Sequence, residues 1–132
     1  MDDRIILLVE DDEDNVVLTR FALRDAGISN RVVVARDGVE ALALLLAPAA
    51  ALRPVLVLLD IRMPRMSGAE VLKRLKADPE TQRIPVILVT VVEPSDEEFD
   101  PIYRQAASHV MKPYDSDQLL EEVRKVLPPP RR

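Results

Sequence analysis

Short runs of consecutive apolar residues recur along the chain, and they constrain its fold more than any other feature. The clear runs are residues 5–9, 32–34, 55–59 and 85–89, with residues 108–111 as a weaker fifth. Because each run is continuous rather than alternating, both faces of the strand that it forms must be covered, as in a parallel sheet. The pattern therefore predicts a parallel sheet with helices on both faces.

Segments with helical periodicity lie between the runs. They are residues 14–26, 39–47, 67–78 and 115–127. The first segment has an apolar side that we expect to face the core, made of Val17, Leu18, Phe21 and Ala22. A further segment, residues 95–107, contains Pro101 and is predicted to be short, kinked or broken.

Alternation of strands and helices five times along the chain predicts an α/β fold. Right-handed crossovers favour a doubly wound (βα)5 flavodoxin-like sandwich with a five-stranded parallel sheet of order 2-1-3-4-5. The 132 residues are enough for one domain. We expect this domain to span residues 1–127, followed by a Pro- and Arg-rich tail over residues 128–132.

Composition excludes several classes of function. The chain has no cysteine and one histidine, which excludes disulfides, thiolate catalysis and two-histidine metal sites. A net charge of −5 argues against sequence-independent nucleic-acid binding. No apolar stretch has the roughly 18 residues that a membrane span needs, and the acidic N-terminus does not resemble a signal peptide. We expect a soluble cytoplasmic domain that binds neither nucleic acid nor membrane.

Polar residues stand where the predicted strands end. The acidic run of residues 10–14 follows the first strand, Asp60 follows the third, Thr90 ends the fourth and Lys112 follows the fifth. The carboxyl ends of parallel strands form the ligand crevice of such sheets, so these groups should converge. Clustered carboxylates repel one another unless a cation such as Mg²⁺ neutralises them. Alone, the acidic run also fits a solvated loop before a helix; together the four positions indicate a phosphoryl site with Asp60 as nucleophile.

Four stretches of the chain resemble the receiver domains of two-component response regulators. They are residues 6–12, 58–68, 89–90 and 111–113. The resemblance covers residues 4–127 and implies a domain that accepts a phosphoryl group on aspartate. Residues 37–42 and 76–86 look more narrowly like the single-domain regulators that partner bacterial phytochromes.

The resemblance implies a role for each metal-site residue. Asp60 matches the phosphoacceptor, Asp11 the direct Mg²⁺ ligand, and Glu10 its water-mediated companion. The backbone carbonyl of Arg62 matches a further metal ligand. The pair Asp11 and Asp12 is an alternative register; we prefer Glu10 and Asp11 because the apolar run ends at residue 9.

The same resemblance implies a switch. Thr90 matches the hydroxyl that moves toward the phosphoryl group, and Lys112 matches the lysine that pairs with it. His109 stands at the switch position that is usually aromatic, and a plain surface role for it stays open. Val91 replaces a small residue and should crowd the acyl phosphate. Val92, together with Arg62, is expected to slow dephosphorylation.

The function that follows is a single-domain response regulator rather than an enzyme, catalysing only its own phosphotransfer and dephosphorylation. Its expected partners are a sensor histidine kinase, such as a bacteriophytochrome, a downstream protein or phosphotransfer domain, and a second copy in a homodimer. Two alternatives stay open. One is a receiver-like interaction module that is not phosphorylated. The other is a Mg²⁺-dependent phosphohydrolase, disfavoured because Arg62 stands where a second acid is expected.

Overall fold

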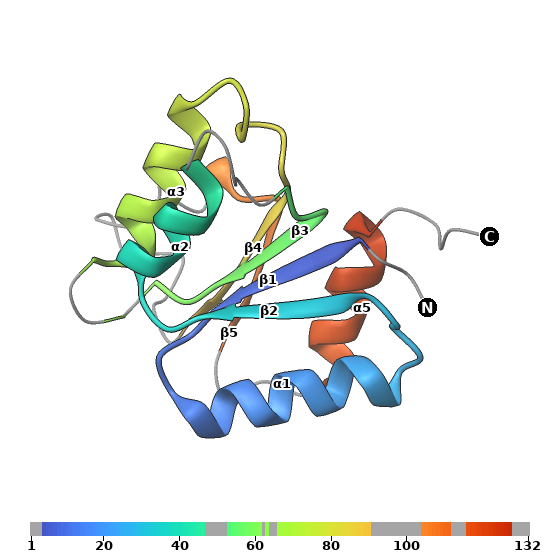
Figure 1. The fold of residues 1–132 in the computed structure, drawn as a ribbon. Helices are drawn as coiled ribbons and strands as arrows, with labels where there is room; N and C mark the ends of the chain where they lie inside the picture. The colour runs from blue at the N-terminus through green and yellow to red at the C-terminus, as the bar shows by residue number, and fades with distance from the viewer. Residues whose placement is uncertain are drawn as a thin grey trace.

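A computed structural model gives a five-stranded parallel sheet covered by helices on both faces (Figure 1). It describes residues 4–46, 53–61, 63, 66–90, 104–111 and 116–127. The described elements are β1 (Ile5–Val9), α1 (Glu13–Asp25), β2 (Arg31–Ala35), α2 (Gly38–Leu46), β3 (Leu56–Leu59), α3 (Gly68–Ala77), β4 (Val86–Thr90), β5 (Ser108–Met111) and α5 (Ser116–Val126). The strand order is β2-β1-β3-β4-β5, which confirms the predicted topology.

Two apolar clusters fill the spaces on either side of the sheet. Alternate residues of each strand point to opposite faces, so neighbours such as Leu7 and Leu8 enter different clusters. One cluster packs the sheet against α2 and α3, and the other packs it against α1 and α5 (Figure 1). The continuous apolar runs are thus explained, because both faces of the inner strands are buried.

The prediction of which side of α1 faces the core was wrong. The buried residues of this helix are Val16, Thr19, Ala22 and Leu23. Val17, Leu18 and Phe21 are instead 56%, 62% and 66% exposed. Apolar residues extend around this helix beyond the side that the sheet can cover, so three of them remain in contact with solvent.

Local signals fix the ends of the helices. The side chain of Asp12 caps the start of α1, and that of Ser67 caps α3 by accepting a hydrogen bond from the Glu70 N–H at 3.4 Å. After α1, Gly27 takes a positive φ of 80°, and the Ile28 N–H donates to the Leu23 carbonyl. These caps set where the chain leaves each helix to begin the next strand.

Several predictions fall on residues outside the described ranges. They concern residues 95–103 of the helix predicted at 95–107, of which only residues 104–107 are described, with 104 and 105 helical. They also concern the side chain of Thr90, the residues Arg62, Val91, Val92 and Lys112, and the tail over residues 128–132. Among the helices that the structure does describe, none combines the length and apolar character needed to cross a membrane.

Candidate metal and phosphoryl site

Three carboxylates meet at the carboxyl ends of β1 and β3. Each of Glu10, Asp11 and Asp60 offers an oxygen, and these oxygens lie within 4.8 Å of one another. The two strands are neighbours, with Val9 opposite Leu59, so the residues that follow them are brought together directly. Glu10 is 4% exposed and Asp60 is 6% exposed, whereas Asp11 faces solvent. The cluster thus has two buried acids and one at the surface.

Backbone hydrogen bonds hold the two buried acids in place. The Glu10 N–H donates to the Ala35 carbonyl at 3.0 Å, and the Asp60 N–H donates to the Val9 carbonyl at 3.1 Å. Both bonds continue the pairing of the sheet by one residue beyond the strands. The positions of these side chains are therefore set by the rigid sheet rather than by a loop.

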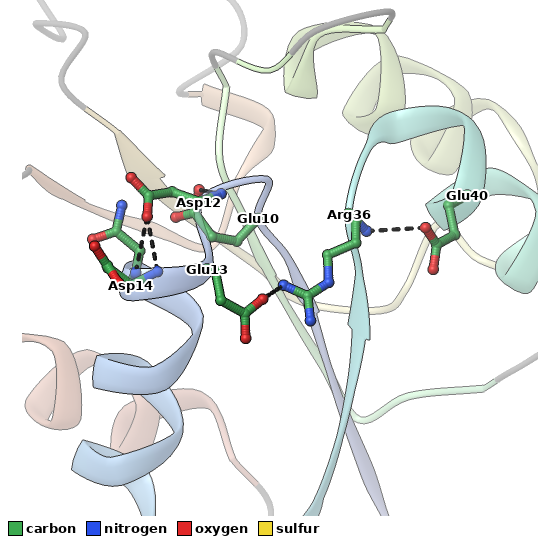
Figure 2. Close-up of polar contacts among 7 residues, drawn as sticks. Glu10, Asp12, Glu13, Asp14, Arg36 and Glu40 are labelled. Atoms are coloured by element: carbon green, nitrogen blue, oxygen red, sulfur yellow. Dashed lines mark hydrogen bonds and ion pairs between the residues drawn. The ribbon is translucent and has the colours of Figure 1, made fainter.

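Asp12 lies outside the cluster and has a different task. Its Oδ1 accepts hydrogen bonds from the N–H groups of Asp14 at 2.9 Å and Asn15 at 3.4 Å, which caps α1 (Figure 2). Its own N–H donates to Oε2 of Glu10 at 3.3 Å. Of the two acid pairs considered from the sequence, the structure brings Glu10 and Asp11 to Asp60.

Arg36, which directly follows β2, contacts both α1 and α2 beside the cluster. Figure 2 shows its guanidinium group turned toward Glu13 of α1, with which it forms an ion pair. Its backbone N–H donates to Oε2 of Glu40 in α2 at 3.2 Å. Arg36 could not be identified from the sequence, because Glu13 is 23 positions away and no local spacing signals the contact.

Gly68 packs directly against the backbone that carries Asp60. Its N–H donates to the Ile61 carbonyl at 2.8 Å. A Cβ atom on this residue would lie 2.7 Å from the Ile61 Cα and 2.8 Å from the Asp60 carbonyl carbon, and it would also overlap the Asp60 carbonyl oxygen. Only glycine permits α3 to begin this close to the site.

The donor set of the cluster fits a hard divalent cation. All three side chains offer carboxylate oxygens, the ligands that Mg²⁺ takes in proteins. Two ionised carboxylates 4.8 Å apart repel by about 3.5 kcal/mol at an effective dielectric of ~20. A bound cation would offset this repulsion and would also neutralise phosphate oxygens.

Of the remaining predicted site residues, His109 is described in full and Thr90 in its backbone. Thr90 ends β4, where its backbone is paired with Met111 of β5. His109 lies on β5, paired with Leu88, and is exposed. Lys112 and Arg62 fall outside the described ranges.

Comparison with known proteins gives a consistent family. The model of the response regulator receiver domain matches residues 6–124. Response regulator Rcp1 of Synechocystis sp. is 35% identical over 97 residues, which cover 71% of this chain and 66% of Rcp1. Response regulator PleD of Caulobacter vibrioides is 36% identical over 92% of this chain, which spans 25% of PleD. The chain thus spans only part of these relatives.

Solved structures agree with the sequence comparisons. The bacteriophytochrome response regulator RtBRR superimposes with a TM-score of 0.81 at 30% identity, covering 94% of this chain and 78% of that chain. Response regulator TrrA of Thermotoga maritima, in complex with Mg²⁺ and BeF, has a TM-score of 0.78 at 29% identity over 94% of this chain and 99% of TrrA.

Proposed function

The chain belongs to the response regulator receiver domain family, and on that premise we propose that Asp60 accepts a phosphoryl group from a sensor histidine kinase. The observation that carries the proposal is the meeting of Glu10, Asp11 and Asp60 at one end of the sheet. An aspartate oxygen attacks phosphorus while the bond from phosphorus to the donor nitrogen breaks. The donor nitrogen keeps the electron pair and takes up a proton.

We assign Mg²⁺ to the carboxylate cluster as the cofactor of this transfer. Asp11 and Asp60 would hold it directly, Glu10 through water, and the Arg62 carbonyl would complete the protein ligands. The cation would supply charge neutralisation for the phosphoryl oxygens. The buried, sheet-held positions of Glu10 and Asp60 support this assignment, because a metal site needs ligands whose geometry is fixed in advance.

Three further residues are proposed to convert phosphorylation into a change of surface. The hydroxyl of Thr90 would donate a hydrogen bond to the phosphoryl group, and the ammonium group of Lys112 would pair with the negative charge of that group. His109 on the exposed edge strand β5 would then rearrange. Thr90 and Met111, the last residues of β4 and β5, are paired at the edge of the sheet where Asp60 follows β3, and Lys112 follows Met111 in the sequence, which supports grouping Thr90 and Lys112 with Asp60. Val92 and Arg62 are proposed to slow hydrolysis of the acyl phosphate by flanking the approach of water, and Val91 is proposed to crowd the acyl phosphate.

The exposed apolar residues of α1 are the surface on which we expect the kinase to dock. The helix begins directly after the carboxylate cluster, so a donor that reaches Asp60 must lie close to its first turns. Val17, Leu18 and Phe21 offer that donor an apolar contact. The similarity to RtBRR makes a bacteriophytochrome the first kinase to test, and a homodimer of residues 1–127 acting on a downstream protein or phosphotransfer domain is the proposed output.

The phosphoryl transfer is tested by measuring the intact mass of the protein after incubation with acetyl phosphate and Mg²⁺. We expect one adduct of about 80 Da, which is lost on chelation and in Asp60→Asn. Asp12→Asn is the matched control, since asparagine keeps the helix cap and Asp12 lies outside the cluster. An absent adduct, where another receiver domain is labelled, would favour the interaction module that is not phosphorylated.

Kinase docking is tested with Phe21→Ser against Val39→Ser, which removes an exposed apolar side chain from α2 instead. Transfer from a phosphorylated bacteriophytochrome kinase should slow in Phe21→Ser alone. Labelling by acetyl phosphate should be equal in both variants, because this small donor needs no docking surface. Equal rates of kinase transfer in the two variants would refute the assignment of α1.

A further inference from the structure

A groove of about 660 Å³ runs between the end of α1 and the strand β2, away from the carboxylate cluster. Its apolar lining comes from Leu23, Ile28, Val32 and Val33. Three arginines, Arg20, Arg24 and Arg31, also line it. We call this feature the arginine groove.

The charges of the arginine groove are unbalanced. No carboxylate is among the described residues that line it. None of the three guanidinium groups forms an ion pair within the part of the chain that the structure describes. Arg20 and Arg24 are one turn apart on α1, and Arg31 begins β2. A patch of charge +3 on a chain of net charge −5 therefore offers a site for an anionic partner.

The groove also lies along an open edge of the sheet. β2 is the first strand in the order β2-β1-β3-β4-β5, and among the described strands it pairs with β1 alone (Figure 1). The Ala35 carbonyl accepts from the Glu10 N–H and so points toward β1. The backbone groups of successive residues point to alternate sides of a strand. The N–H and C=O groups of Arg31 and Val33 therefore also point toward β1, whereas those of Val32 and Val34 point outward, away from β1.

We propose that an extended acidic segment of a partner protein docks in the arginine groove as an added strand along β2. Its backbone would bond to the outward groups of Val32 and Val34, as in other cases of strand addition. Acidic side chains on the α1 face of the segment would reach Arg20 and Arg24, and an acidic residue on its other face, the face of Val33, would reach Arg31. Five residues of such a segment match the length of β2, about 17 Å.

Charge alone would also suit a nucleic acid, but the groove favours a peptide. Its wall offers the outward backbone N–H and C=O groups of β2 and the partly buried valines of that strand. Both complement an extended chain whose side chains alternate. The lining residues that the structure describes include no aromatic side chain on which a base could stack.

The probe is a fluorescein-labelled octapeptide in which glutamates alternate with valines, measured by fluorescence anisotropy with the full chain. We expect saturable binding that weakens with NaCl. Arg20→Glu/Arg24→Glu should weaken it at least tenfold. Arg83→Glu/Arg104→Glu, which reverses two exposed arginines elsewhere, should leave it within about twofold. Equal weakening by both pairs would refute the proposal, because net charge alone would then explain binding.

The strand geometry needs its own test. Val34→Pro removes an outward N–H without removing a hydrogen bond to β1, and it should weaken peptide binding. A melting temperature of the variant close to that of the wild type checks that the fold is kept. An octapeptide with proline at alternate positions should bind at least tenfold more weakly than the probe. Equal binding of the proline peptide, or tighter binding of a DNA duplex, would overturn the proposal.

Two further controls separate this proposal from the others. Asp60→Asn should bind the peptide like the wild type, so failure of phosphorylation and failure of peptide docking are distinguishable. Sedimentation of the chain alone should show no self-association that depends on Arg20 and Arg24. Loss of a dimer in Arg20→Glu/Arg24→Glu would identify a second copy as the occupant and would contradict an acidic partner protein.

Discussion

Replacing Gly68 by alanine places a methyl group against the backbone that carries Asp60. The new carbon would lie 2.7 Å from the Ile61 Cα, whereas carbon atoms in contact are normally ~3.5–4.0 Å apart. Either α3 or the Asp60–Ile61 segment must therefore move by about 1 Å. Overpacking of this kind costs about 1–3 kcal/mol of the free energy of unfolding.

The same displacement should affect the chemistry more than the stability. A misplacement of about 1 Å at a reacting centre can lower a rate about 100-fold. We expect labelling of Gly68→Ala by acetyl phosphate to be ~10- to 100-fold slower than labelling of the wild type, measured by intact mass over time. Urea unfolding of the same samples gives the free energy of unfolding.

Gly27→Ala is the matched control. Gly27 has a φ of 80°, and a Cβ atom there would meet nothing within 4 Å. Alanine should therefore cost about 1–2 kcal/mol through backbone strain without moving Asp60. If Gly68→Ala is labelled as fast as Gly27→Ala at similar stability, the reasoning that Gly68 positions Asp60 is refuted.

Three further predictions concern the metal, the core and the pH dependence. Asp11→Asn should lower Mg²⁺ affinity at least tenfold by calorimetric titration, while Asp12→Asn stays within about twofold; equal losses would contradict the assignment. Leu45→Ala, at a fully buried position, should lower the free energy of unfolding by about 2–5 kcal/mol in urea, and a loss below ~1 kcal/mol would contradict tight packing there. The Ser108 hydroxyl donates to Glu122 at 2.7 Å and, with Lys125, lowers the pKa of that carboxyl. Ser108→Ala should therefore cost about 1 kcal/mol at pH 7, and the difference from wild type should shrink as pH falls through the lowered pKa of Glu122; a difference that stays constant in urea unfolding down to about pH 3 would argue against it.

The sequence was sufficient to predict the sheet. Runs of Leu, Ile and Val that are continuous rather than alternating occur where both faces of a strand are buried, as in β1 and β3. Right-handed connections then leave few possible orders, and the observed order is the predicted one. The convergence of Glu10, Asp11 and Asp60 follows from the same topology.

Other features depend on contacts that no local pattern encodes. Val17 and Phe21 are as apolar as Leu23, and only the packing of α1 on the sheet decides which of them is buried. Consecutive acids such as Asp11 and Asp12 look alike in a sequence, but the start of α1 takes Asp12 as its cap. The pairing of Arg36 with Glu13 likewise exists only once β2 lies beside β1.

The position of β1 inside the sheet has a consequence for how the chain folds during translation. The first strand to be synthesised pairs with β2 on one side and with β3 on the other. At ~5–20 residues per second, β1 waits several seconds for residues 56–59 to leave the ribosome. Until then, its second edge and much of its apolar surface lack their native cover. We therefore expect the nascent domain to acquire its stability late, in a cooperative step after the third strand, rather than strand by strand as it emerges.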